Sequence, residues 1–205
     1  QSRQKIEREL QRRAASMMPG GKTYSIDLSG STPAGCSSAP VTVVAYECAR
    51  CPYCTRLTPA LYRSVTTGAL SKKAKFYLKI FPIRSHPNSK PGGLAFQAAQ
   101  ELGKFWPYVL HVYSVFDSFD PAKLPDYAVA HGMDRQQFID VMNSSSTYDK
   151  VVASKKEGVV NNVNATPTLF ISGRKYTADL GITAVVDALL EEWERKKGIQ
   201  YVDQR

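Results

Sequence analysis

The chain has 205 residues, of which 43% are hydrophobic and 22% are charged, so it can form one globular domain or a core domain with an insertion. It contains no run of about 18 or more apolar residues, which excludes an ordinary transmembrane helix within this sequence. The formal net charge is +9, and because no basic stretch interleaved with aromatic residues accompanies it, we interpret it as a solvated surface and expect no nucleic-acid partner.

The first expected element is a helix over residues 3–18, which the run MPGG (18–21) ends. A lone helix with a narrow apolar stripe must dock, and we expect it to dock on its own domain, with an arm that joins two copies as the alternative. Because the sequence begins at Gln1 and shows no signal-peptide core, we also expect a processed chain whose targeting segment lies out of view.

The next elements form a strand–helix–strand unit. Alternating apolar residues predict a strand over 22–28, which a loop rich in Ser, Gly and Pro follows. The run VTVVAY (41–46) is β-branched and nearly all apolar, as expected of a strand that is buried on both faces. A helix is expected over 51–67 and the next strand over 75–83, with a right-handed crossover between the two strands.

The rest of the chain is predicted as a helical block followed by a strand–strand–helix unit. Helical patterns fill residues 88–163, where Pro107 opens one helix and Asp134 caps another. TLFISG (168–173) is expected to return to strand, with residues 174–175 as the hairpin turn ahead of an amphipathic last helix. The fold class that this order predicts is α/β.

Residues 47–54 read ECARCPYC, in which three cysteines stand three apart and form two overlapping C-x-x-C motifs. Cys51 is expected at the junction of a buried strand and a helix whose first residue is Pro52. There it faces the unpaired N–H groups and the positive end of the helix dipole, which lower the pKa of a thiol. We therefore predict Cys51 as the exposed, nucleophilic thiol.

The two neighbouring cysteines differ from Cys51. Cys54 shares the core-facing stripe of the helix, so we predict a shielded thiol that resolves mixed disulfides. Cys48 stands where the strand ends, with no array of donors aimed at it, so we expect no bridge between Cys48 and Cys51.

A metal site is another use of such cysteines. A structural zinc site needs a second pair of ligands, but the remaining thiol, Cys36, and the three histidines are not paired at ligand spacing. An iron–sulfur run would need a further cysteine and proline that are absent at that place. We predict no metal and no organic cofactor, and keep as an alternative a metal- or cluster-binding module built from the four thiols (Cys36, Cys48, Cys51 and Cys54).

Residues 163–173 read VNATPTLFISG, and Pro167 opens the expected strand, where a proline cannot donate to the ladder. Two interpretations stay open: an ordinary trans peptide bond, and a cis Thr166–Pro167 bond that exposes backbone groups beside the thiols. In the second interpretation an extended substrate can pair with that backbone as an added strand.

The order of these motifs resembles the thioredoxin superfamily. CPYC follows a buried strand, Pro59 comes five residues after Cys54, and a Thr-Pro pair precedes a late strand. The long helical block, and FPIRSHPN (81–88) ahead of it, are similar to the DsbA-like branch. The resemblance covers about residues 22–197 and implies a thioredoxin fold with an inserted helical domain.

The resemblance implies a thiol–disulfide oxidoreductase that acts on cysteine-containing proteins in a bacterial cell envelope, periplasmic or exported, with a membrane redox partner that resets the dithiol. It implies that the CPYC dithiol is catalytic, that Thr166–Pro167 is the cis-proline loop, and that Pro52 and Tyr53 lie beside the substrate. The expected segments are an N-terminal extension, a first half with CPYC, a helical insert and a second half with the cis-proline (1–21, 22–87, 88–162 and 163–205).

The sequence departs from this family pattern in its buried acid and its extra cysteines. Many relatives carry an acidic residue six positions before the first active-site cysteine, where this chain has Ala45. Glu47 on the same strand face is a candidate substitute, with an ordinary surface glutamate as the alternative. Cys48 is a candidate for capturing a mixed disulfide. A second disulfide from Cys36 to Cys48 requires residues 36–40 to run back along the strand, because six extended residues span about 20 Å.

The direction of exchange stays open at this point. A low pKa at Cys51 stabilises the reduced form and favours an oxidase, whereas Thr before the proline together with CPYC is similar to isomerase and reductase members. The N-terminal helix is the candidate arm for the dimer that an isomerase needs, with a monomer as the alternative. A glutathione-dependent transferase or isomerase on the same scaffold is a further alternative, against which the second cysteine, Cys54, argues.

Overall fold

The computed structural model describes residues 2–17 and 21–203 of the chain. The strands of this part are β1 (Val41–Glu47), β2 (Ala74–Ile80), β3 (Thr168–Ile171) and β4 (Arg174–Lys175). They form one sheet in the order β2–β1–β3–β4. The β1–β2 pair is parallel, and the β1–β3 and β3–β4 pairs are antiparallel.

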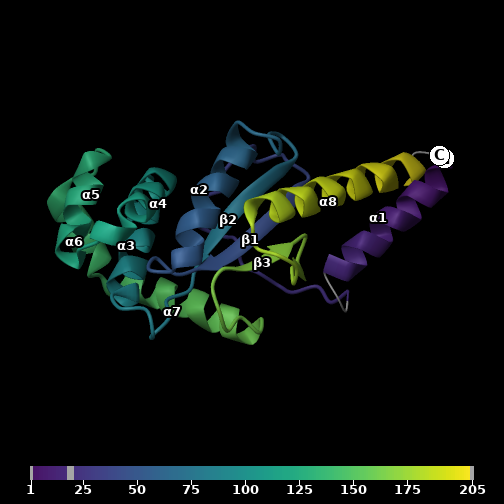
Figure 1. Ribbon diagram of the computed structural model, residues 1–205. Coiled ribbons are helices and arrows are strands. Elements are labelled where there is room, and N and C mark those ends of the chain that lie inside the picture. The colour runs from purple at the N-terminus through teal and green to yellow at the C-terminus, as the bar shows by residue number, and fades with distance from the viewer. Residues whose placement is uncertain (1, 18–20, 204–205) are drawn as a thin grey trace.

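The α-helices of the described residues fall into three groups (Figure 1). Two of them, α2 (Pro52–Thr66) and α8 (Ile182–Asp203), pack against the strands. Five more follow β2 as a block: α3 (Ser89–Glu101), α4 (Phe105–Ser114), α5 (Leu124–Ala130), α6 (Arg135–Met142) and α7 (Ser145–Val160). In Figure 1, α3 to α6 gather at one side of the sheet, and α1 (Arg3–Met17) lies alongside α8 at the other.

Strand β1 is the centre of the structure, and its composition explains its position. Its odd-numbered apolar residues face the larger core cluster, and its even-numbered residues Val44 and Tyr46 face a second, smaller cluster on the opposite side. Both faces are therefore removed from water, which favours the β-branched, almost wholly apolar run that predicted a buried strand. The expected order of a βαβ unit, a helical block and a ββα unit is confirmed.

The strand expected over 22–28 is wrong. This segment makes one isolated bridge, between Thr23 and Arg174, because β4 is too short to pair with more of it. Elsewhere along the segment side chains satisfy the backbone, as where the Glu157 carboxylate accepts the Asp27 N–H at 2.9 Å. The alternating apolar side chains still pack on the smaller core cluster, which explains why the pattern resembled a strand.

The hairpin turn expected at residues 174–175 is also wrong, because these residues form β4. The turn lies one step earlier, at Ser172 and Gly173, whose φ values are +50° and +80°. A two-residue hairpin loop needs positive φ at its centre, and glycine adopts that conformation without steric cost.

The helix boundaries follow local capping chemistry. The Asp134 side chain caps α6 by accepting the Gln137 N–H at 2.8 Å, as expected. The helix expected to open at Pro107 begins two residues earlier, which leaves the proline in the first turn, where no N–H is needed. Helix α1 is confirmed as far as Met17, and the stop expected from residues 18–20 lies outside the described residues.

Helix α7 approaches the smaller core cluster closely, and a glycine makes this approach feasible. A Cβ atom added at Gly158 would lie 2.6 Å from two ring carbons of Phe81 and 3.1 Å from a ring carbon of Tyr46. Both rings are buried, with exposed fractions of 1% and 0%, so neither can move aside into solvent.

We therefore expect Gly158→Ala to destabilise the fold by about 1–3 kcal/mol, the usual cost of overpacking a core. The matched control is Gly198→Ala in α8, where nothing lies within 4 Å of the added Cβ. That change should be neutral or stabilising by up to about 1 kcal/mol, since alanine is the better helix former. Urea unfolding of both variants measures the difference, and equal stabilities would contradict this packing.

Candidate active site

The two cysteines of CPYC lie where β1 leads into α2. Cys51 is the N-cap of α2, with extended backbone angles of φ −86° and ψ 122°, and Pro52 is the first helical residue. The Cys54 N–H, one turn later, donates to Cys51 Sγ at 3.3 Å. The Cys51 N–H in turn donates to the Cys48 carbonyl at 3.2 Å, which closes the turn between strand and helix.

The pKa of Cys51 is lowered to about 6 in this position. The largest cause is the hydrogen bond from the Cys54 thiol, which burial of Cys51 opposes, and the Thr166 side chain and the first N–H groups of α2 add to the lowering. Each of these donors stabilises a sulfur that carries negative charge. At neutral pH, Cys51 is therefore largely a thiolate.

The prediction that Cys51 is an exposed thiol is wrong for this conformation, since its exposed fraction is 1%. The cover comes from the segment ahead of β3, where the Thr166 carbonyl lies 3.4 Å from Cys51 Sγ. Tyr53, by contrast, is 66% exposed beside it. The exposed edge of the site therefore lies at Tyr53, next to the covered sulfur.

The Thr166–Pro167 peptide bond is cis, which was the second of the two interpretations of this sequence. Thr166 Oγ1 is buried and has no hydrogen-bond partner among the residues that the structure describes. It is a donor that a Cys51 thiolate can recruit, which accounts for the lowering of the Cys51 pKa by this side chain.

Cys54 and Glu47 form the deeper part of the site. Burial raises the pKa of Cys54 well above that of an ordinary thiol, and the hydrogen bond to Cys51 and the charge of Glu47 raise it further. Glu47 is fully buried, so the alternative of an ordinary surface glutamate is wrong. Burial raises the Glu47 pKa to about 8, although hydrogen bonds from Thr58 and Tyr113 oppose the change.

The two remaining cysteines lie in different surroundings. Cys48 is fully buried, its Sγ lies 3.3 Å from His86 Nδ1, and burial raises its pKa. Cys36 lies in the turn before β1, where its carbonyl accepts the Ala39 N–H at 3.0 Å, and so stands at the opposite end of the strand from Cys48. The strand spans about 20 Å, whereas a disulfide needs Cα atoms within about 7 Å, so this fold does not join Cys36 to Cys48.

Three groups at the site were not predicted from the sequence as site residues. Thr58 and Tyr113 hold the Glu47 carboxyl, at 2.5 and 3.0 Å, and His86 contacts the Cys48 sulfur. Thr58 could have been found, because it lies one turn beyond Cys54 on the buried face of α2. Tyr113 and His86 reach the site through tertiary packing alone.

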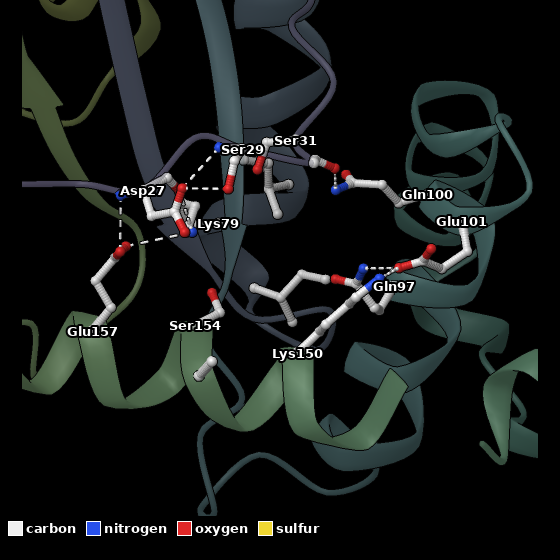
Figure 2. A pocket seen from close by; sticks show the side chains of 14 residues that line it. Asp27, Ser29, Ser31, Lys79, Gln97, Gln100, Glu101, Lys150, Ser154 and Glu157 are labelled. Carbon is white, nitrogen blue, oxygen red and sulfur yellow. Dashed lines mark hydrogen bonds and ion pairs between the residues drawn. The ribbon is translucent and has the colours of Figure 1, made fainter. Parts of the chain in front are cut away.

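A separate polar cavity of about 350 Å³ lies between the segment before β1, strand β2, and helices α3 and α7 (Figure 2). The lysines at its wall are paired, Lys79 with Glu157 at 3.4 Å and Lys150 with Glu101 at 2.5 Å. Ser154 Oγ in the same wall is buried and has no hydrogen-bond partner in the described part of the chain. No residue of the dithiol region lines this cavity, so the candidate reactive centre is the cysteine site.

Two further features of the described residues concern metal binding and membrane crossing. No group of three or more His, Cys, Asp or Glu side chains in residues 2–17 and 21–203 is placed to hold a metal ion, so the four thiols do not form such a group. Over the same residues, no helix combines the length and the apolar character that crossing a membrane requires.

The sheet order, the dithiol at the tip of α2, the cis-proline before β3 and the inserted helices define a protein with a thioredoxin fold. A family model described as thioredoxin matches residues 29–191, and the chain therefore belongs to the thioredoxin family.

Solved structures share this fold. The oxidised form of BdbD from Bacillus subtilis superposes with a TM-score of 0.73 at 16% identity, covering 84% of this chain and 97% of that one. The thiol-disulfide exchange protein alpha-DsbA2 from Wolbachia pipientis gives a TM-score of 0.68 at 17% identity, covering 92% and 96%. The catalytic domain of Proteus mirabilis ScsC gives 0.68 at 13% identity, covering 92% and 98%. At these identities the likeness establishes the DsbA-like fold.

The curated proteins that are similar in sequence bear the name of Na(+)/H(+) antiporters. A Na(+)/H(+) antiporter NhaA 1 of Mycolicibacterium gilvum is 30% identical over 158 residues, which is 76% of this chain and 25% of that protein. A Na(+)/H(+) antiporter NhaA of Herminiimonas arsenicoxydans is 26% identical over 157 residues, 75% of this chain and 25% of that protein. The chain thus spans about a quarter of the length of these relatives.

The alkylation rate of Cys51 in the reduced protein should follow an ionisation with its midpoint near pH 6. Cys54→Ala should move this midpoint upward, because it removes the largest stabilising donor, whereas Cys54→Ser keeps a hydroxyl donor there and should move it less. Iodoacetamide labelling across a pH series, read by peptide mapping, measures both. A wild-type midpoint near that of a free thiol, about 8.5, would contradict the geometry.

The free energy of unfolding of the reduced protein should depend on pH because Glu47 releases its proton at different pH values in the folded and unfolded states. The folded state holds the Glu47 proton up to about pH 8, whereas an unfolded glutamate releases it near 4.5. The folded state thus binds more protons in this window, so stability falls as pH rises from 4.5 to 8. Glu47→Gln cannot titrate at this position, so its stability should not fall in this way. The free energy of unfolding of the variant minus that of wild type should therefore rise between pH 4.5 and pH 8 by on the order of 4 kcal/mol. Urea unfolding at both limits tests this, and a constant difference would refute it.

Proposed function

We propose that this protein catalyses thiol–disulfide exchange on cysteine-containing proteins, with Cys51 as the nucleophile and Cys54 as the resolving thiol. The observation that carries the proposal is the Cys51 sulfur at the N-cap of α2, which accepts from Cys54 and faces the cis Thr166–Pro167 bond. The fold shared with a thiol-disulfide exchange protein supports the same chemistry.

The reaction oxidises a substrate dithiol when the protein starts as the Cys51–Cys54 disulfide. A substrate thiolate attacks Cys51 Sγ, the bond between the two sulfurs breaks, and the electron pair leaves with Cys54. A second substrate thiolate then attacks the substrate sulfur of the mixed disulfide and releases Cys51 as a thiolate. The substrate gains a disulfide, and the protein ends with two reduced cysteines. Reduction of a substrate is the same sequence in reverse.

Glu47 is proposed as the proton donor and acceptor for Cys54. When Cys54 leaves as a thiolate, its raised pKa makes it a base that takes a proton from the neutral Glu47 carboxyl. In the reverse direction the Glu47 carboxylate accepts the proton that Cys54 must lose before it attacks. A carboxyl whose pKa lies near the working pH suits both roles.

The exposed edge of the site is proposed to bind the substrate backbone. Pro52 and Tyr53 lie in solvent next to the sulfur, and the segment with Thr166 and Pro167 crosses in front of it. An extended peptide can pair with this segment as an added strand, which would bring its cysteine to Cys51. Cys48 remains a candidate for capturing a mixed disulfide, although its sulfur is buried.

The direction that the site favours is oxidation. A thiolate stabilised at Cys51 stabilises the reduced protein, which makes the disulfide form a stronger oxidant. Oxidised substrates persist outside the reducing cytosol, so we propose an exported protein of a bacterial cell envelope, with a membrane redox partner that reoxidises the dithiol. The docked helix α1 is consistent with a monomer.

The reduction potential of the Cys51–Cys54 pair, measured in glutathione buffers, tests the direction. We expect a value near −120 mV, typical of a strong oxidant, whereas a value near −270 mV would mark a reductant. Exchange itself is tested by oxidation of a reduced two-cysteine peptide with the disulfide form of the protein, which Cys51→Ser and Cys54→Ser should both abolish because neither can form the Cys51–Cys54 disulfide. With a disulfide-bonded peptide as substrate, reduced Cys54→Ser should instead stop at a mixed disulfide on Cys51, since the resolving thiol is missing. Cys36→Ser, at the far end of β1, is the matched control and should keep full activity. Full activity of Cys51→Ser would refute the proposed function.

A further inference from the structure

Among the described residues, the buried Glu47 carboxyl has only hydroxyl partners. Thr58 Oγ1 donates to Glu47 Oε1 at 2.5 Å, and Tyr113 Oη donates to Oε2 at 3.0 Å. No lysine, arginine or histidine within residues 2–17 and 21–203 forms an ion pair with it. Its charged state therefore depends on two O–H donors, and each donor contributes to the balance between carboxylate and carboxylic acid.

The two donors differ in what else they can reach. Tyr113 Oη lies 3.1 Å from the Cys48 carbonyl as well as 3.0 Å from Glu47 Oε2. A phenol has one hydrogen to donate and lone pairs to accept with. With Glu47 ionised, Tyr113 donates to the carboxylate. With Glu47 protonated, the carboxyl O–H can donate to Tyr113 Oη while Tyr113 turns its hydrogen to the Cys48 carbonyl.

Both protonation states of Glu47 are thus satisfied by the same phenol without any movement of heavy atoms. The phenol stays neutral throughout, because burial raises the pKa of Tyr113 well above its ordinary value. The Cys48 carbonyl that takes part is also the one that accepts the Cys51 N–H. A change in the protonation of Glu47 therefore changes the hydrogen bonding of the Cys48 carbonyl, in the turn that carries Cys51.

We propose that Tyr113, from helix α4 of the helical block, is a positioning residue that sets the pH at which Glu47 exchanges its proton with Cys54. This rests on the proposed function for its consequence in catalysis, whereas its effect on Glu47 stands on the contacts alone.

Other groups around Glu47 also titrate or carry charge, and the pH dependence must be separated from theirs. The turn contributes Cys48, α2 contributes Cys51 and Cys54, and α4 contributes Tyr113. Further out, His86 contacts Cys48 Sγ at 3.3 Å and Lys155 interacts with the same sulfur, but neither has a hydrogen bond to Glu47. Observing the Glu47 carboxyl itself removes the ambiguity.

The test follows the carboxyl carbon of Glu47 by NMR in the full reduced chain, across a pH series. Wild type should titrate near pH 8. Tyr113→Phe should raise that midpoint by about one to two pH units, the size expected when a carboxylate loses one hydrogen bond. Thr58→Val removes the other donor and should raise it similarly. Tyr108→Phe is the matched control, since Tyr108 is also buried in α4 but donates to the Leu124 carbonyl at 3.0 Å, and it should leave the midpoint unchanged.

The second readout is the rate at which Cys54 resolves a mixed disulfide on Cys51, measured as a function of pH. Tyr113→Phe should slow it several-fold at pH 7 and move its inflection upward with the NMR midpoint. In a Glu47→Gln background the same change should have no such effect, because the two residues act as one unit. If the NMR midpoint stays at the wild-type value in a folded Tyr113→Phe protein, the proposal is overturned. If the midpoint moves but no variant performs exchange, the positioning role stands and the proposed function fails.

Discussion

The hydrogen bond from the Cys54 thiol to the Cys51 sulfur separates the chemistry of two otherwise identical side chains. It is the largest cause that lowers the Cys51 pKa to about 6, and the same bond helps to raise the pKa of Cys54. The chain geometry supplies this bond, because the N-cap and the third helical residue of an α-helix lie one above the other. A C-x-x-C pair at a helix N-terminus therefore produces one thiolate and one thiol rather than two intermediate groups.

Burial and like charge then oppose the accumulation of negative charge in the site. The charge of Cys51 raises the pKa of Glu47 and of Cys54, and the charge of Glu47 raises that of Cys54. Burial, helped by the charges of Glu47 and Cys54, raises the pKa of Tyr113 and keeps it neutral. Such groups titrate as a coupled set, so a proton lost by one is retained by another. When a disulfide forms and removes the Cys51 charge, the cost of ionising Glu47 falls. The electrostatics of the site thus links its redox state to the proton on the carboxyl.

The sequence revealed those parts of the site whose causes are local. The N-cap position of Cys51 follows from a buried strand, a proline and a helix in succession, and the shielding of Cys54 follows from helical periodicity. The expected strand at 22–28 failed because pairing needs a partner edge, and β4 proved too short to provide one. Tyr113 could not be found at all, since 66 residues separate it from Glu47 and no local pattern marks it.

The position of the acid explains why the helical block takes part in the site. Ala45 and Glu47 share one face of β1, but Glu47 is the last strand residue, at the end where the turn to α2 begins. Glu47 pairs with Ile80 at the end of β2, and α4 reaches its carboxyl there with Tyr113.

The same block also holds the turn from its outer side. The Arg50 guanidinium lies 4.3 and 4.2 Å from the ring centroids of Phe116 and Phe119 and donates to the Phe116 carbonyl at 3.0 Å. Stacking and a charged hydrogen bond together fix the residue directly before Cys51. Tyr113 contacts the turn from inside and Arg50 holds it from outside. Movement of the inserted helices against the sheet would therefore shift the turn that carries Cys51.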